Sequence, residues 1–128
     1  MNFLLDTHSF IWFIEDNPSL SAQARIIIEE PSNDLLLSIA SVWEMAIKVS
    51  LGKLQIRQSF DRFIPDQLML NNINLLDITI SHTLHIATLP FHHRDPFDRL
   101  LIAQSLIEGI PLISIDTLFD TYGVSRLW

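Results

Sequence analysis

Cysteine is absent from this chain of 128 residues. Its absence excludes a disulfide scaffold, a thiolate zinc finger and a cysteine nucleophile. Glycine occurs only three times and never in a cluster, so no glycine-rich loop can cradle a phosphate, and no Ser-His-Asp arrangement is recognisable. The sequence also lacks a basic, apolar leader and any apolar run long enough to cross a bilayer, which predicts a soluble cytoplasmic protein without a membrane segment.

Positive charge is scarce as well. Eight Lys and Arg residues stand against 15 Asp and Glu residues, which gives a net charge of −7 at pH 7. Because phosphate binding usually leaves a basic footprint on a protein, this balance argues at first against a nucleic-acid partner. A hydrophobic share of 48% with only 18% charged residues excludes intrinsic disorder. The length fits one domain over residues 1–128.

Short apolar runs alternate with helical patterns along the chain. Apolar strands separated by helices favour a mostly parallel sheet that is covered on both faces. The sequence therefore predicts an α/β fold, organised as a three-layer α/β/α domain. The expected strands are residues 2–5, 35–39, 73–78, 111–115 and 124–128. The expected helices are residues 9–14, 19 or 21 to 30, 41–51, 60–71, 79–90 and 95–109, with a short helical turn at 117–122.

Carboxylates follow two of the predicted strands. Asp6 and Thr7 come directly after the first strand, and Ser114 and Asp116 stand at the end of the fourth. In open parallel sheets, function collects in the crevice beyond the carboxyl ends of the strands. If these two strands are neighbours, both acids project into that crevice. Each Asp could instead serve only as the cap of the next helix.

Further acids come from the predicted helices. Glu44 lies on a helix that is apolar nearly all round, and it shares one narrow stripe with Ser41 and Lys48. A carboxylate on such a helix needs a partner, and the spacing leaves both Lys48 and a metal ion open. Asp95 is a sound N-cap. Asp98, in the first turn of the same helix, stabilises the helix start and also points toward the crevice.

Four acids from separate segments can thus reach one end of the sheet. Clustered carboxylates repel one another, so they are tolerated only when some stay protonated or a cation neutralises them. Hard oxygen ligands favour Mg²⁺ or Mn²⁺, and such ions bind a phosphate and activate water for attack at phosphorus. The residues therefore point to metal-dependent phosphoryl chemistry. Much of the negative charge then belongs to the metal site, and the acidic balance does not exclude RNA.

With these residues in hand, the chain resembles PIN-domain proteins of the VapC toxin type. The resemblance rests on LLDTH at 4–8, SIASVWEMAIK at 38–48, HRDPFDRLLIAQ at 93–104, LISID at 112–116 and the segment 122–128. It implies a PIN-like α/β/α fold that holds one or two Mg²⁺ or Mn²⁺ ions and hydrolyses RNA phosphodiester bonds as an endoribonuclease. The acids that these motifs carry over as catalytic and metal-binding residues are Asp6, Glu44, Asp98 and Asp116.

The resemblance also implies that the chain is the toxin of a type II toxin–antitoxin pair. Its partners would then be an RNA substrate, a cognate antitoxin protein and a second copy of the chain in a homodimer. Supporting roles are expected for Thr7, Ser114, Asp95 and Lys48.

Basic residues and histidines beside the third acid leave two interpretations open. His93, Arg94 and Arg99 are expected to contact RNA phosphates, although an ordinary solvated loop explains them equally well. The five histidines show no recognisable zinc spacing. Two other functions also stay open: a metal-dependent nuclease or phosphatase acting on another phosphoester, and a non-catalytic binding module with a PIN fold.

Overall fold

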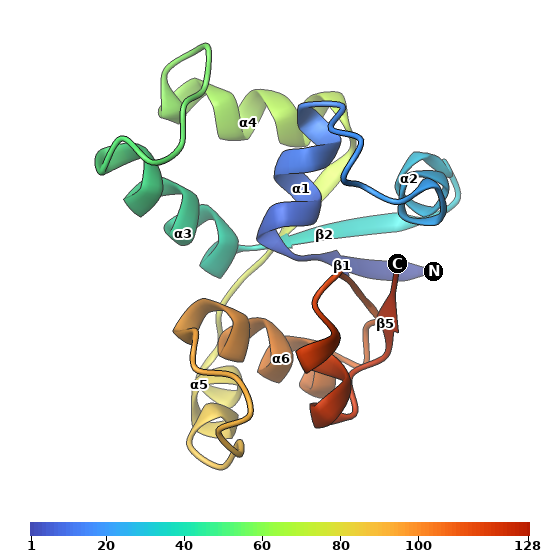
Figure 1. Cartoon of the computed structure of the whole chain (residues 1–128), viewed down its shortest axis with the longest axis vertical. Coiled ribbons are helices and arrows are strands. Elements are labelled where there is room, and N and C mark those ends of the chain that lie inside the picture. Colours follow the sequence, from blue (N-terminus) through green and yellow to red (C-terminus); the bar gives the residue numbers. More distant parts are fainter.

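The computed structural model describes all 128 residues, whose strands form one five-stranded sheet. The strands are β1 (Asn2–Leu5), β2 (Asp34–Ser38), β3 (Ile73–Leu76), β4 (Leu112–Ile113) and β5 (Arg126–Leu127). Their order across the sheet is β3-β2-β1-β4-β5, and every neighbouring pair is parallel (Figure 1). The predicted parallel sheet is therefore confirmed.

Helices cover both faces of this sheet, which confirms the three-layer α/β/α prediction. The helices are α1 (Thr7–Ile14), α2 (Ala22–Glu29), α3 (Ile39–Ser50), α4 (Phe60–Leu70), α5 (Ile80–Ile86), α6 (Pro96–Glu108) and the 3₁₀ helix η1 (Thr117–Tyr122). Helices α1 to α4 lie on one side of the sheet, in the upper half of Figure 1, whereas α5, α6 and η1 lie below it. No helix combines the length and the apolar character needed to cross a membrane.

Two hydrophobic clusters hold the layers together. Phe3 and Leu5 of β1 belong to the cluster beneath α1–α4, whereas Leu4 belongs to the cluster that packs against α6. This division follows from the alternation of side chains along a strand. Each fully buried side chain of this kind stabilises the fold by about 1.5–3 kcal/mol. Burial on both faces fixes β1 at the centre of the molecule.

Several predicted boundaries are wrong by a few residues, and local capping explains the largest shifts. Helix α1 begins at Thr7 rather than at residue 9, because the side chain of Asp6 caps it. Helix α3 begins at Ile39, inside the predicted second strand, because Ser38 Oγ accepts the N–H of Ala40 at 3.0 Å. The strands β3, β4 and β5 are shorter than predicted, and α5 ends at Ile86 rather than near residue 89.

The strand order reverses at β1. From β1 the chain builds β2 and β3 on one side of it, and then returns to place β4 and β5 on the other. Leu4 pairs with Leu112 and Leu5 with Ile113 across this junction. A crevice opens beyond the carboxyl ends of the strands at such a switch point. The polar residues that follow β1 and β4 therefore enter the same crevice.

Candidate active site

Asp6 joins β1 to α1 at this crevice. The residue is 5% exposed, and its Oδ1 accepts the N–H of Ser9 at 2.8 Å. Burial raises the pKa of Asp6, and hydrogen bonds from Ser114 and Ser9 lower it in part. The capping role considered from the sequence is therefore real. It coexists with a buried carboxylate whose ionised form is disfavoured by burial, so that a cation bound nearby would stabilise that form.

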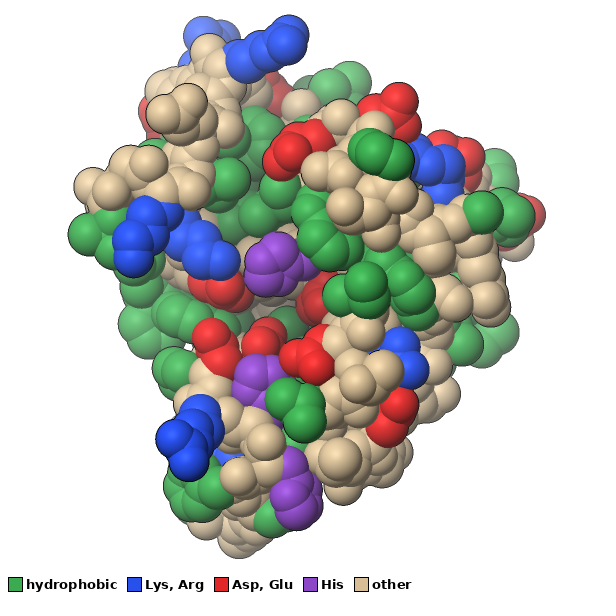
Figure 2. Space-filling view, viewed as in Figure 1, with side chains coloured by type: hydrophobic (Ala, Val, Ile, Leu, Met, Phe, Trp, Pro, Cys, Tyr) green, Lys and Arg blue, Asp and Glu red, His purple; other side chains and the backbone are tan.

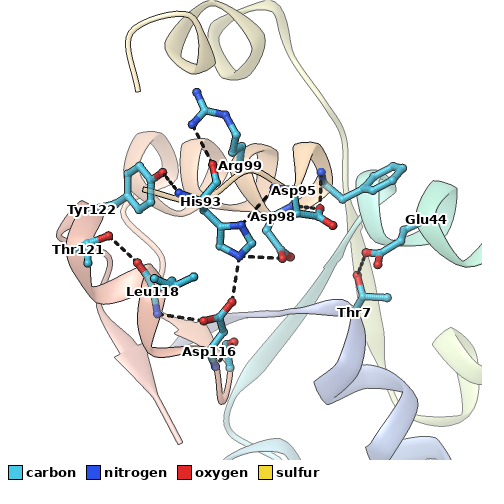
Figure 3. A network of polar contacts seen from close by, with 12 residues as sticks. Thr7, Glu44, His93, Asp95, Asp98, Arg99, Asp116, Leu118, Thr121 and Tyr122 are labelled. Carbon is cyan, nitrogen blue, oxygen red and sulfur yellow. Dashed lines mark hydrogen bonds and ion pairs between the residues drawn. The ribbon is translucent and has the colours of Figure 1, made fainter. Parts of the chain in front are cut away.

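Asp116 enters the crevice from the neighbouring strand. Its Oδ1 accepts the N–H of Leu118 at 3.0 Å and so caps η1. The N–H of Asp116 donates to Ser114 Oγ at 3.0 Å, which fixes the turn after β4. Because capping uses only one carboxylate oxygen, Oδ2 is directed at His93 (Figure 3).

Asp95 and Asp98 divide two tasks at the start of α6. Asp95 Oδ1 accepts the N–H groups of Phe97 at 2.9 Å and of Asp98 at 3.0 Å. Asp95 is thus the helix cap that the sequence predicts. The carboxylate of Asp98 is not needed for capping and points into the crevice (Figure 3).

The pKa of Asp98 is shifted by burial and by the charges around it. Its pKa is raised to about 7, first by burial and then by the charge of Asp95. Glu44 and Asp6 raise the pKa further, whereas His93 lowers it. The charges of Glu44 and Asp6 thus act on Asp98 across the same crevice, although neither residue belongs to the closest group of ligand atoms, which is formed by His93, Asp98 and Asp116. Mutual repulsion in a partly buried crevice marks a place where a cation is strongly favoured.

His93, which the sequence analysis expects to contact substrate phosphates, lies between two of the acids. Its Nε2 lies 3.1 Å from Asp98 Oδ2 and 2.9 Å from Asp116 Oδ2, between the two acids (Figure 3). The ring stacks on Phe119 with centroids 5.7 Å apart, and the backbone N–H of His93 donates to the Tyr122 hydroxyl at 2.7 Å. The only signal in the sequence was its position two residues before the capping Asp95.

Glu44 takes part in a second polar network on the α3 side. Thr7 Oγ1 donates to Glu44 Oε1 at 2.7 Å, and Ser41 Oγ lies 2.9 Å from the same hydroxyl. Lys48 Nζ lies 3.0 Å from Glu44 Oε2. The helical pair considered from the sequence is therefore present, and Thr7 links it to the start of α1. Ser41, which shared the predicted polar stripe, belongs to this network as well.

The closest convergence joins a histidine to two of the four predicted acids. Ligand atoms of His93, Asp98 and Asp116 all lie within 4.8 Å of one another. Figure 2 shows acidic side chains gathered around a hollow in this face of the molecule, with histidine beside them. Carboxylate oxygens suit Mg²⁺ and Mn²⁺, whereas an imidazole nitrogen is a ligand typical of transition metals such as Fe, Ni, Cu and Zn. The donor set therefore fits a divalent cation.

Arg99, which the sequence analysis expects to contact RNA, is engaged within the protein instead. The residue is 5% exposed, and its guanidinium donates to four backbone carbonyls. The acceptors are the carbonyl oxygens of Ile86, Leu89, Pro90 and His93. Arg99 therefore organises the loop that carries His93. Arg94 is exposed and stays available at the rim of the site.

A groove of about 640 Å³ lies elsewhere on the surface. It runs between α1, α4 and the loop that joins α3 to α4, and Ile11, Leu54 and Phe63 are among its lining residues. None of the acids described above lines it. The crevice that holds the acids and this groove, whose lining is half hydrophobic and half polar, are thus separate features.

The fold and the acidic switch point define a class of α/β domains, and comparison with known families identifies which one. The family model described as the PIN domain matches residues 3–124, and the chain belongs to this family. The resemblance read from the motifs is thereby confirmed.

One curated relative is similar to part of this chain. Ribonuclease VapC16 of Mycobacterium tuberculosis is 36% identical over 73 residues, which are 54% of this chain and 52% of that protein. The chain thus spans about half the length of this curated relative.

Solved structures agree over nearly the whole chain. VapBC2 from Rickettsia felis, bound to a DNA fragment from its promoter, has a TM-score of 0.74 at 15% identity and covers 99% of this chain and 98% of that one. VapBC-1 from nontypeable Haemophilus influenzae has a TM-score of 0.67 at 19% identity, with coverages of 99% and 97%. At these identities the likeness establishes the fold.

Proposed function

We propose that this chain is a Mg²⁺- or Mn²⁺-dependent endoribonuclease that acts as the toxin of a type II toxin–antitoxin pair. The observation that carries the proposal is the acidic crevice at the switch point, where burial, and then the charge of neighbouring carboxylates, raises the pKa of Asp98 to about 7. A relative named as a ribonuclease and structural neighbours named VapBC support the same reading.

Asp98 and Asp116 are the residues best arranged to hold one or two ions, together with Asp6 and Glu44, directly or through water. A bound Mg²⁺ or Mn²⁺ supplies positive charge to the phosphodiester and makes water a better nucleophile. Four carboxylates in one crevice match the preference of these ions for oxygen ligands. The acids are therefore proposed as the catalytic and metal-binding residues.

The other residues of the site are proposed to position these acids. Asp95 holds the first turn of α6 and so sets the direction of Asp98. Ser114 hydrogen-bonds Asp6, and Thr7 fixes one oxygen of Glu44. Well-oriented carboxylates bind a cation without a reorganisation cost.

Lys48 and Arg94 are the cations available to a substrate. Lys48 pairs with Glu44, and Arg94 is exposed beside the cluster. A phosphate approaching the crevice would meet both side chains. They are proposed to contribute modestly to RNA affinity, because so few positive charges give only a weak electrostatic contribution.

The proposal includes partners that the family resemblance implies. These are an RNA substrate, a cognate antitoxin and a second copy of the chain in a homodimer, with a cytoplasmic location. The groove that Ile11, Leu54 and Phe63 line together with polar residues is a candidate surface for the antitoxin, because it combines apolar contacts with hydrogen-bonding groups.

The proposal is tested with purified protein and a quenched fluorogenic single-stranded RNA. We expect cleavage with Mn²⁺ or Mg²⁺ and none after chelation. Asp6→Asn should abolish cleavage and leave the circular dichroism spectrum intact. The matched control is Asp34→Asn, because Asp34 is exposed at the opposite end of β2. Undiminished, metal-dependent cleavage by the Asp6→Asn protein would contradict the assignment.

Two further assays separate the alternative functions. Activity on single-stranded RNA, single-stranded DNA and a phosphomonoester, compared at equal metal concentration, distinguishes an RNase from another phosphoesterase. Isothermal titration with Mn²⁺ distinguishes both from a non-catalytic PIN-fold module, for which we expect no binding heat. Failure to bind Mn²⁺ or Mg²⁺ would favour the binding module.

A further inference from the structure

An aromatic pair stands at the surface between α3 and α6. The rings of Trp43 and Phe97 meet edge to face, with centroids 4.9 Å apart and planes at 80°. Trp43 is 57% exposed, although tryptophan is highly buried in most proteins. Each ring immediately precedes an acid of the site, Glu44 and Asp98 respectively. The pair therefore bridges the two helices that carry these acids, one residue away from each acid along the chain.

Packing within the protein does not account for this pair. Trp43 is mostly exposed, and the partly buried Phe97 does not pack against either of the two hydrophobic clusters. By contrast, Trp12 and Trp128 contact each other, with centroids 6.0 Å apart, and both pack against the cluster beneath α1–α4. Of the three tryptophans, Trp43 alone leaves most of its surface to solvent. A large exposed aromatic beside a crevice commonly marks a contact with another molecule.

The scarcity of positive charge on this protein explains why a nucleic acid would be held by an aromatic contact. The net charge of −7 and the scarcity of lysine and arginine deprive the protein of a broad surface for phosphates. Stacking of a base on an aromatic ring needs no positive charge and tolerates any base, because every base has a π-face. An aromatic surface next to the acids can therefore hold a strand that the acids themselves repel.

We propose that Trp43, supported edge-on by Phe97, is a stacking platform for a nucleobase next to the phosphate that enters the acidic crevice. This inference rests on the proposed function and specifies how a single-stranded RNA is held. Trp43 is then a substrate-positioning residue. Phe97 keeps the indole in place and lies on the helix that carries Asp98.

The same ring also belongs to an apolar stripe, which gives the competing explanation. Trp43, Ile47 and Leu51 are all exposed and follow one another at four-residue spacing along α3 and its C-cap. A protein surface covering this stripe would bury all three residues. The nucleobase is favoured because the partner of Trp43 is Phe97, which comes from α6 and not from the stripe.

The first test measures cleavage kinetics on a short single-stranded RNA. Replacing Trp43→Ala should raise KM about 5- to 150-fold, the range for loss of one stacked base, with kcat changed much less. Trp43→Phe should retain most of the affinity. Leu51→Ala is the matched control, because it removes an exposed apolar side chain of the same stripe away from the acids. When the RNA carries an abasic nucleotide beside the scissile phosphate, the wild type and Trp43→Ala should have the same KM, because no base is left to stack on Trp43.

The second test does not depend on catalysis. RNA added in the presence of chelator should quench tryptophan emission of the wild type and of Trp12→Phe, but not of Trp43→Phe. Size-exclusion chromatography with light scattering monitors the oligomeric state of the same variants. Because Trp43 is exposed, we expect unchanged melting temperatures.

The outcomes separate the two hypotheses. If the wild type cleaves RNA and Trp43→Ala changes neither KM nor the quenching of fluorescence, the stacking platform is wrong. The proposed function is then unaffected. A loss of oligomers shared by Trp43→Ala and Leu51→Ala, without an effect on KM, assigns the stripe to a protein interface and also overturns it. A wild type that neither binds nor cleaves RNA overturns the proposed function itself.

Discussion

Nε2 of His93 lies 2.9 Å from Oδ2 of Asp116, and the same nitrogen lies 3.1 Å from Oδ2 of Asp98. The other ring nitrogen, Nδ1, accepts the N–H of Asp95 at 3.2 Å. A nitrogen that accepts a hydrogen bond does not carry the proton, so the proton is on Nε2 and is shared by two carboxylates. His93 thus holds together two acids that come from different elements and otherwise repel each other.

The first prediction concerns His93→Ala. Without the imidazole N–H, Asp98 and Asp116 face each other unscreened, and the metal-free protein should lose about 1–3 kcal/mol of unfolding free energy at pH 8. Mn²⁺ should then raise the melting temperature of His93→Ala by more than that of wild type. Differential scanning fluorimetry measures both shifts, with His85→Ala of α5 as the control. A smaller Mn²⁺ effect in His93→Ala would mean that His93 is itself a ligand.

The second prediction concerns pH. The pKa of Asp98 is raised from 3.8 to about 7, so the folded state binds a proton more tightly than the unfolded state does. The contribution of Asp98 to the free energy of unfolding is therefore fully present below pH 3.8, and it is lost as the pH rises to about 7.

A cation competes with this proton for the same carboxylate. Stabilisation by Mn²⁺ should therefore grow from pH 5.5 to pH 8, and Asp98→Asn should abolish that growth. Thermal melts with and without Mn²⁺ across this range provide the measurement. A Mn²⁺-induced shift that is the same at every pH would show that Asp98 is not a ligand.

The third prediction contrasts two neighbouring arginines. Arg99→Lys leaves several buried carbonyls of the His93 loop without donors, and we expect a loss of about 3 kcal/mol or more of unfolding free energy. Arg94→Ala, at an exposed position, should change stability by less than about 0.5 kcal/mol. Urea unfolding followed by fluorescence distinguishes them. If Arg94 contacts RNA, its variant should raise KM without altering the urea midpoint.

The fourth prediction tests the link between α1 and α3. Thr7→Val keeps the side-chain shape but removes the hydroxyl that donates to Glu44 at 2.7 Å. Loss of a hydrogen bond to a charged group should cost about 1.5–3 kcal/mol and reduce cleavage. Thr7→Ser, which restores the hydroxyl, should recover most of both. Equal activity of the Val and Ser variants would show that the orientation of Glu44 is not limiting.

Residues next to strand ends and helix starts were predictable because their placement depends on local structure. The run before Asp6 and the run before Ser114 both read as buried strands, and adjacent parallel strands end at the same edge. Asp95 was predictable as a cap for a similar reason, since Asp followed by Pro starts helices. These local rules predict that the acids lie near one another, without any information on tertiary contacts.

Residues placed by long-range contacts were not predictable in this way. The loop between α5 and α6 takes its shape from the guanidinium of Arg99, and no sequence pattern shows that this side chain turns inward. Since His93 lies on that loop, its position between the acids follows from the same contact. The exposure of Trp43 is likewise a tertiary property, because an apolar helix reads as buried on all sides.

The pairing of Leu5 with Ile113 has a consequence for how the protein folds. These strands are separated by most of the chain, and joining them requires closure of a very long loop, which slows folding. Partly folded chains with β1, β2 and β3 assembled still lack Asp116 beside Asp6. The recovery of cleavage during refolding should therefore lag behind the recovery of helical signal and coincide with the last cooperative step.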